Sequence, residues 1–162
     1  MITISQNFAK VLTDYVGRLQ NHDFSEAAMA IAAAIVWSDG RLDEVEQAKL
    51  EEFITTSPLL QPFTPFRLLN TFQHYSEMYK LHGGKGTEGV RRAVLRIQDE
   101  DQQVLLLKFA LVLAKADDPV LHDDEEQVIR EFCRLLNIHE NEVFGEIHDD
   151  DGDSDSDSDS ED

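Results

Sequence analysis

One acidic phrase occurs twice in this chain and constrains its folding more than any other feature. The copies cover residues 34–46 and 112–125, and each runs from an apolar helical stretch through Asp and a short turn to Leu and then Glu. The matching positions keep helical spacing on both sides of the turn. Each copy therefore predicts a helix-turn-helix unit, and the two units should be related by a pseudo-twofold axis. The matched pairs are Asp39 with Asp117, Leu42 with Leu121, Glu46 with Glu125, Leu50 with Ile129 and Phe53 with Phe132.

Almost every segment of the chain has helical periodicity, and none shows convincing strand-like alternation. We therefore expect an all-α protein, a compact bundle of about seven helices. The alanine-rich stretch that begins near Ser25 is apolar all round, which predicts a central helix. Pro65 after Thr64 predicts a helix start, while residues 82–84 and Asn137 predict helix stops. The expected helices cover residues 5–20, 25–38, 44–56, 65–82, 89–98, 99–115 and 124–136, with a short turn of helix at 140–144.

The composition changes abruptly after residue 147, which predicts a helical domain at 1–147 and a tail at 148–162. The tail alternates Asp and Ser, contains no apolar residue and carries nine of the 33 acidic residues of the chain. Because such a segment cannot offset the entropy lost on ordering, we expect it to be disordered. Its expected role is to keep the protein in solution, with cation collection, phosphorylation and docking on a basic partner as alternatives.

Charge and composition also limit the class of protein. The net charge of −19 argues against nonspecific nucleic-acid binding, which needs clustered Lys and Arg, and favours cations or basic protein surfaces as partners. The single cysteine, Cys133, excludes an internal disulfide, and its apolar surroundings indicate a buried hydrophobe rather than a reactive thiol. The sequence opens with no basic, apolar leader and contains no apolar run of 18 residues, so we expect a soluble cytoplasmic protein.

The acidic residues of the repeated phrase allow two interpretations, of which the first is helix capping. Asp43 has a Glu three positions later, Glu46, which is the capping-box pattern. In the second copy, Asp123 with Glu126 offers the same pattern, and Asp39 can cap its own turn.

In the second interpretation the repeated phrase holds a cation. The Asp and Glu of each copy would converge between the two hairpins, where carboxylates favour Ca²⁺, Mg²⁺ or Mn²⁺. The converging pairs would be Asp39 with Glu46 and Asp117 with Glu125. His122 stands where the first copy has Asp43, and it either shifts one half-site towards a transition metal or is an exposed imidazole. Neither copy matches an EF-hand loop, because the alternating ligands before a central Gly are missing.

Three further stretches carry a family resemblance. They are residues 84–88 (Gly-Lys-Gly-Thr-Glu) before a helix, residues 114–117 leading into 123–126, and residues 129–145. Together with the doubled phrase, they make the chain resemble the tellurite-resistance TerB family over roughly residues 8–147. The resemblance implies an all-helical fold with internal pseudo-symmetry and a link to tellurite and general chemical-stress responses. It also implies metal binding through the acidic repeats and action in assemblies at the inner membrane surface.

Carried over residue by residue, the resemblance implies seven metal-binding positions. They are Asp39, Asp43, Glu46, Asp117, His122, Asp123 and Glu125. This chain departs from the family pattern where Asp118 and Pro119 replace the usual Gly, and where His122 replaces a common acid. We expect a divalent cation, with Ca, Mg or Mn ahead of Zn, and no organic cofactor. We also expect protein partners with basic surfaces and a peripheral place at the inner face of the cytoplasmic membrane.

The expected function is a non-enzymatic stress-response module without catalytic residues. One alternative is a metal-free protein-interaction module, and another is a metal-dependent hydrolase. A hydrolase needs open metal coordination and usually His ligands or a base, whereas the six histidines show no paired ligand spacing. Residues 82–87 resemble a phosphate-binding loop, but their order is wrong for a Walker motif and no strand precedes them.

Overall fold

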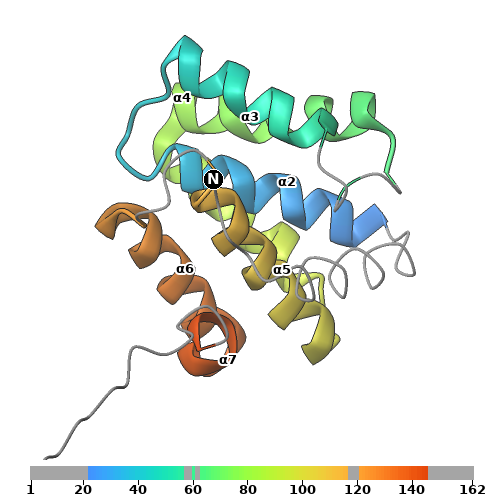
Figure 1. Cartoon of the computed structure of the whole chain (residues 1–162), viewed down its shortest axis with the longest axis vertical. Helices are drawn as coiled ribbons and strands as arrows, with labels where there is room; N and C mark the ends of the chain where they lie inside the picture. The colour runs from blue at the N-terminus through green and yellow to red at the C-terminus, as the bar shows by residue number, and fades with distance from the viewer. Residues whose placement is uncertain (1–21, 57–59, 61–62, 117–120, 146–162) are drawn as a thin grey trace, which may run out of the picture.

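The described part of the chain consists of helices joined by turns and loops. The computed structural model describes residues 22–56, 60, 63–116 and 121–145, and these residues contain no β-strand (Figure 1). Their helices are α2 (His22–Val36), α3 (Glu44–Thr56), α4 (Pro65–Leu95), α5 (Glu100–Ala114), α6 (Asp123–Leu136) and α7 (Glu140–Phe144). The all-α class is therefore confirmed. The helix expected at 5–20, the loop that contains Asp117 and the tail at 148–162 lie outside the described residues.

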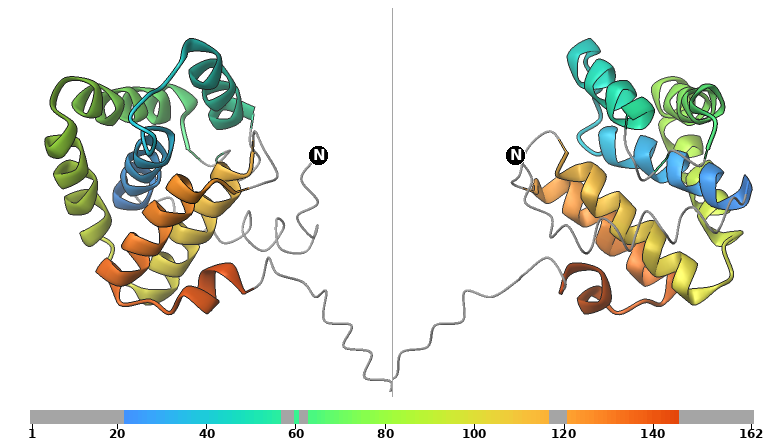
Figure 2. Two further views of the ribbon diagram at one scale, coloured as in Figure 1. Left: turned by 90° about the vertical axis from the view of Figure 1, so that its left-hand side faces the viewer. Right: turned by 45° about the vertical axis from the view of Figure 1, so that its right-hand side comes forward.

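Helix α2 lies at the centre, with α3 and the first half of α4 on one side and α5 and α6 on the other (Figures 1 and 2). The second half of α4 turns away from α3 and runs beside α2 towards the start of α5 (Figure 2). Ten of its fifteen residues are buried, and six of those ten are alanines. Small side chains let neighbouring helices approach closely, while larger ones such as Met29 and Ile31 fill the remaining space. The prediction of a central helix in this stretch is confirmed.

The start of α2 differs from the sequence-based expectation. Ser25 was expected to mark the beginning, but the helix begins at His22. The Ser25 hydroxyl donates to the backbone carbonyl of His22, 2.9 Å away, and so belongs to the first turn. A serine hydroxyl can bond backward to a carbonyl as readily as it can cap, and a sequence does not distinguish the two.

Helix α4 consists of two helical halves that meet at a kink, which confirms the helix stop predicted at residues 82–84. The backbone leaves the helical region at His82 and Gly83, and the second half begins directly after them, earlier than the expected start at residue 89. Residues 84–88 therefore belong to the second half of α4 rather than to a loop. A Cβ atom on Gly86 would lie only 2.8 Å from Cγ of Tyr79, so the missing side chain at Gly86 lets the Tyr79 ring pack against it. This contact packs the two halves of α4 against each other across the kink.

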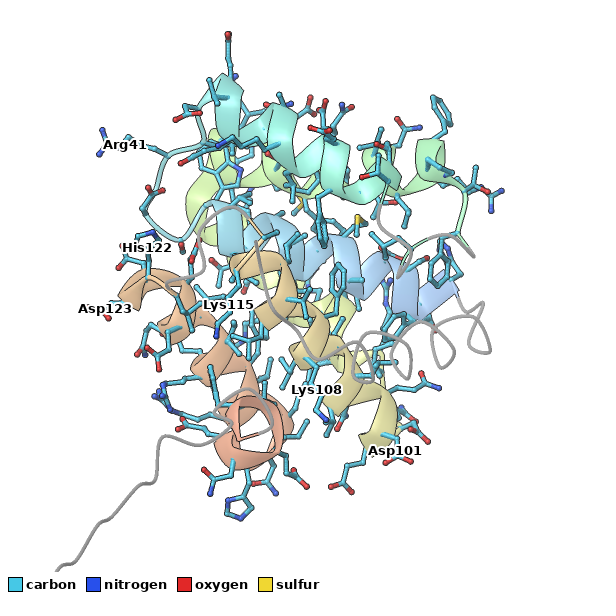
Figure 3. All side chains as sticks on the ribbon, in the orientation of Figure 1. Arg41, Asp101, Lys108, Lys115, His122 and Asp123 are labelled. Atoms are coloured by element: carbon cyan, nitrogen blue, oxygen red, sulfur yellow. The ribbon has the colours of Figure 1, made fainter. Side chains whose placement is uncertain are left out.

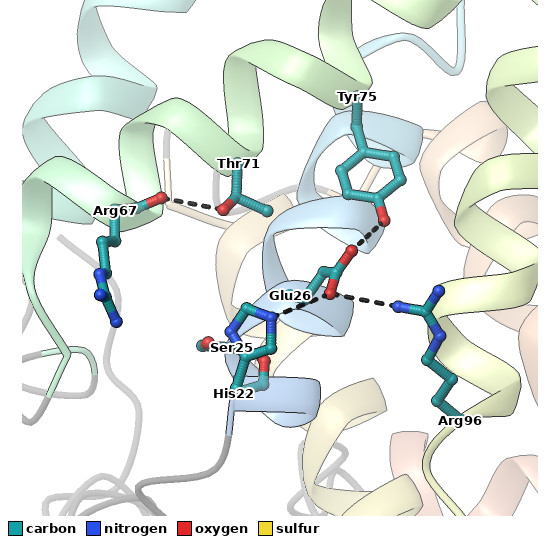
Figure 4. Close-up of polar contacts among 7 residues, drawn as sticks. All are labelled: His22, Ser25, Glu26, Arg67, Thr71, Tyr75 and Arg96. Atoms are coloured by element: carbon teal, nitrogen blue, oxygen red, sulfur yellow. Dashed lines mark hydrogen bonds and ion pairs between the residues drawn. The ribbon is translucent and has the colours of Figure 1, made fainter.

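A carboxylate on α2 ties both halves of α4 together (Figure 4). Glu26 accepts a hydrogen bond of 2.8 Å from the hydroxyl of Tyr75, which precedes the bend. Its other oxygen lies 3.2 Å from a guanidinium nitrogen of Arg96, which caps the C-terminal end of α4. The exposed imidazole of His22 lies 3.5 Å from the same oxygen. Burial, followed by the bond to Glu26, raises the pKa of Tyr75 well above its usual value.

Several helix ends follow the sequence signals. Asp99 caps α5, since its Oδ1 accepts from the backbone N–H of Gln102 at 3.0 Å. Asn137 ends α6 in the left-handed region at a φ of 56°, as predicted. The short helix α7 begins at Glu140, where a turn of helix was expected. Within the described residues, no helix is both long and apolar enough to cross a membrane.

Arg130 fastens α7 onto α6. Its guanidinium pairs with Glu126, one turn earlier on α6, and with Glu140 at the start of α7. It also lies over the ring of Phe144, 4.7 Å from the ring centroid. The hydrogen bonds that Arg130 donates to these carboxylates, chiefly to Glu126, raise its pKa. Cys133, on the same helix, is fully buried, which confirms the prediction of a buried hydrophobe.

Candidate metal centre

The first acidic corner connects α2 to α3 through a tight turn. The Gly40 N–H donates to the carbonyl of Trp37 at 2.9 Å, and Gly40 has a φ of 81°, which favours glycine. Oδ1 of Asp39 accepts from the backbone N–H of Arg41 at 3.0 Å. Asp39 therefore closes the turn with its own side chain, as the capping interpretation predicted. Its second oxygen takes no part in that bond.

Asp43 and Glu46 form a reciprocal cap at the start of α3. The Glu46 N–H donates to Oδ1 of Asp43 at 2.8 Å, and the Asp43 N–H faces Oε2 of Glu46 at 3.4 Å. This arrangement is the predicted capping box. Each carboxylate retains lone pairs for another partner, so capping and cation binding are compatible at these residues.

The second corner has a different register from the one expected. His122 is the N-cap residue of α6, and its N–H faces Oε2 of Glu125 at 3.4 Å. Asp123 is already the first helical residue, so the predicted capping box of Asp123 with Glu126 is wrong by one position. Leu121 precedes this cap and packs against the core, as Leu42 does before the first cap. The two leucines therefore occupy equivalent positions, one residue before each cap.

The two corners face one cavity of about 580 Å³. It lies between the turn after α2, the inner face of α3, the end of α5 and the start of α6. Four of the seven predicted metal-binding residues line it, two from each corner: Asp39, Glu46, His122 and Glu125. Figure 3 shows His122 beside the turn that carries Arg41. Asp43 and Asp123 do not line the cavity. Asp117 lies outside the described residues.

The cavity also contains charged residues that the sequence interpretation missed. Lys49 and Glu52 line it from α3, and Asp124 lines it from α6. Helical spacing could have found the first two, since positions 46, 49 and 52–53 fall on one face of a helix. Lys49 brings a positive charge to an otherwise acidic wall.

The donor chemistry of this cavity suits a hard divalent cation. Carboxylate oxygens predominate, as Ca²⁺ and Mg²⁺ require, and the single imidazole of His122 also suits Mn²⁺. Asp39, Glu46 and His122 are exposed to solvent. Among residues 22–56, 60, 63–116 and 121–145, no three His, Cys, Asp or Glu side chains are grouped closely enough to hold a metal ion.

Comparison with known proteins assigns the family. The sequence model of the family described as "Tellurite resistance protein TerB" matches residues 25–144, which is well over half of the chain. The chain belongs to the TerB family. The matched stretch contains both acidic corners and the whole cavity between them. No curated protein and no solved structure gives a significant match.

Proposed function

We propose that this TerB-family protein is a non-enzymatic stress-response module, active in tellurite and chemical-stress resistance, that binds a divalent cation between its two acidic corners. The observation that carries the proposal is the shared cavity, because Asp39 and Glu46 reach it from one corner and His122 and Glu125 from the other. The Glu residues of the two corners are 79 positions apart in sequence, yet both line this one cavity.

The two helix-turn-helix units act as half-sites in this proposal. Their pseudo-twofold relation is supported by equivalent roles, since Asp43 and His122 are the caps and Glu46 and Glu125 are the third helical residues. A cation would offset the repulsion between the carboxylates and draw the corners together. Asp43 orients Glu46, Asp123 adds negative charge beside the site, and Asp117 supplies a further ligand. Ca²⁺, Mg²⁺ or Mn²⁺ fits this set better than Zn²⁺.

The module would act with protein partners in the cytoplasm, in part at the inner face of the membrane. The net charge of −19 favours partners with basic surfaces. A metal-free interaction module is the second candidate, and it is favoured by large apolar side chains that remain exposed. These are Val45, Phe66, Leu81 and Leu95.

A melting experiment distinguishes the two candidates. A cation that binds only the folded protein stabilises it by about 2–3 kcal/mol at about a hundred times its Kd, and the melting temperature rises accordingly. The full chain and a version ending at His148 should be melted in Ca²⁺, Mg²⁺, Mn²⁺, Zn²⁺ or chelator at constant ionic strength. The shorter version removes cation binding by the tail.

Matched variants assign any shift to the cavity. The double variant Asp39→Asn, Glu46→Gln should lose the cation-dependent rise in melting temperature. The control Asp101→Asn, Glu77→Gln removes the same charge from residues outside the cavity and should keep the rise. Asp101 lies at the opposite end of α5 from the corners (Figure 3). If no cation raises the melting temperature, or if the cavity variant responds like the control, the cation-binding proposal is wrong.

A further inference from the structure

A second cavity of about 580 Å³ opens between the end of α2, both halves of α4 and the C-terminal half of α6. It shares Ser38 with the acidic cavity but none of the predicted metal-binding residues. Its volume lies within the range of about 300–1,000 Å³ typical of small-molecule sites.

Aromatic and aliphatic side chains form the walls of this second cavity. Trp37 is held in place by a bond of 2.8 Å from its indole N–H to the Ser76 hydroxyl. Tyr79 is held by its packing against Gly86 beyond the bend of α4. Phe132 is buried on α6, and Val128 and Leu135 line the same side. Apolar side chains from the end of α2, from α4 and from α6 therefore surround the cavity, and the apolar part of a ligand could pack against them.

Two arginines line the cavity, Arg91 on α4 and Arg134 on α6. Within the part of the chain that the structure describes, neither guanidinium has an ion pair. Their neighbours differ, since Arg92 lies 3.9 Å from Glu88 and Arg130 pairs with two glutamates.

The lining contains one acid, Glu131, whose Oε1 accepts from the side-chain amide of Gln127 at 3.3 Å. Two arginines against one glutamate give the lining a net positive charge. The positive charge of this lining contrasts with the whole chain, which carries 33 acidic and 14 basic residues.

We propose that this cavity binds a small anionic amphiphile. Arg91 and Arg134 would hold a carboxylate or phosphate head, which guanidinium groups recognise with paired N–H donors. The alkyl or aryl body would lie against Trp37, Tyr79 and Phe132. A cavity with both features selects against neutral apolar molecules, which leave the charges unused, and against small inorganic anions, which leave the walls uncovered.

The chain supplies its own reporter for this site, because Trp37 is its single tryptophan. The full chain should be titrated with octanoate and with octyl phosphate while Trp37 emission and the heat of binding are followed. These two probes identify the preferred head group. We expect saturable binding of at least one of them. Octanol and inorganic phosphate, which each lack one half of the ligand, should bind at least about tenfold more weakly.

Variants of exposed residues test the roles of the charges without disturbing the core. Arg91→Gln and Arg134→Gln should each weaken binding of the better probe by about tenfold. Arg92→Gln removes the same charge from the same helix but outside the cavity, and it should leave binding unchanged. Glu131→Gln should tighten binding, since it removes the one anion that opposes the head group.

Three results would overturn the proposal. The first is absence of saturable binding by either probe at millimolar concentration. The second is equal affinity for octanol, which would mean that the arginines take no part. The third is a loss of binding in Arg92→Gln as large as in Arg91→Gln and Arg134→Gln, which would indicate attraction by overall charge rather than a site. Circular dichroism and melting of each variant check that the fold is retained.

Discussion

At the scale of single residues, Cys133 shows how burial sets side-chain chemistry in this protein. Its thiol is fully buried on α6. Burial is the main cause of a pKa raised to about 11, and the negative charge of Glu140 adds to it. Because the thiolate is the reactive form, this cysteine is poorly suited to reduce tellurite or to sense oxidants.

The raised pKa of Cys133 predicts a pH dependence of stability. In the unfolded chain the thiol ionises near its ordinary pKa of 9.0, whereas in the folded protein it keeps its proton until about pH 11. The unfolded state therefore loses this proton first, so the contribution of Cys133 is fully present below about pH 9 and is lost as pH rises towards 11. Urea unfolding at pH 8 and pH 10 should show a smaller loss of stability in Cys133→Ala than in the wild type. Equal losses would contradict the prediction, because other groups titrate alike in both proteins.

At the scale of helices and turns, sequence signals succeeded where the deciding contact is local. Asp43 with Glu46, Asp99 and Asn137 each act within one turn of helix, and their roles could be predicted from spacing alone. The kink in α4 also falls at the stop that residues 82–84 predicted. The packing of Tyr79 against Gly86 across that kink could not be predicted, because it is a contact between the two halves.

The predicted start of α6 was wrong by one residue. Two acidic candidates, Asp123 and Asp124, follow His122, and the capping preferences of the residues favour an Asp. In the structure α6 begins at Asp123, so His122 is the cap, and Leu121, directly before it, packs against the core. Residue preference alone therefore places the start one residue too late.

Two glycines provide a matched test of the turn geometry. An added Cβ would meet no atom within 4 Å at either Gly40 or Gly84, so any effect comes from the backbone. Gly40→Ala should destabilise the protein by about 1–2 kcal/mol, because alanine resists a φ of 81°. Gly84→Ala should stabilise it by about 0.5–1 kcal/mol, because the position is helical. Urea unfolding of the two variants measures both changes, and destabilisation by both would refute the assignment of residues 84–88 to α4.

At the scale of the whole molecule, charge is divided between two cavities beside the end of α2. Five acidic residues and Lys49 line the first cavity, while two arginines and Glu131 line the second. Sequence repetition predicts that the two corners converge, and four of the seven predicted residues line one cavity, while their convergence on a cation stays a prediction. It could not predict the second cavity, since Arg91 and Arg134 belong to no repeated phrase and only the packing of α6 near the second half of α4 brings them to one site.

Lys49 should weaken cation binding in the first cavity, because its ammonium group opposes any cation that enters. We therefore expect Lys49→Gln to increase the affinity for Mg²⁺ or Ca²⁺ by about threefold to tenfold, as removal of one nearby charge at a partly screened site should. Without divalent cation the same variant should be slightly less stable, by about 0.5 kcal/mol, because less positive charge offsets the carboxylates.

Calorimetric titration at fixed ionic strength measures the change in affinity, and melting in chelator measures the change in stability. Lys85→Gln is the matched control, since Lys85 is exposed on α4 and does not line the cavity. If both variants gain affinity equally, the cation responds to the net charge of the protein, and the cavity has no particular role. A gain confined to Lys49→Gln would mean that the cation lies within reach of α3, between the two corners that the repeated phrase builds.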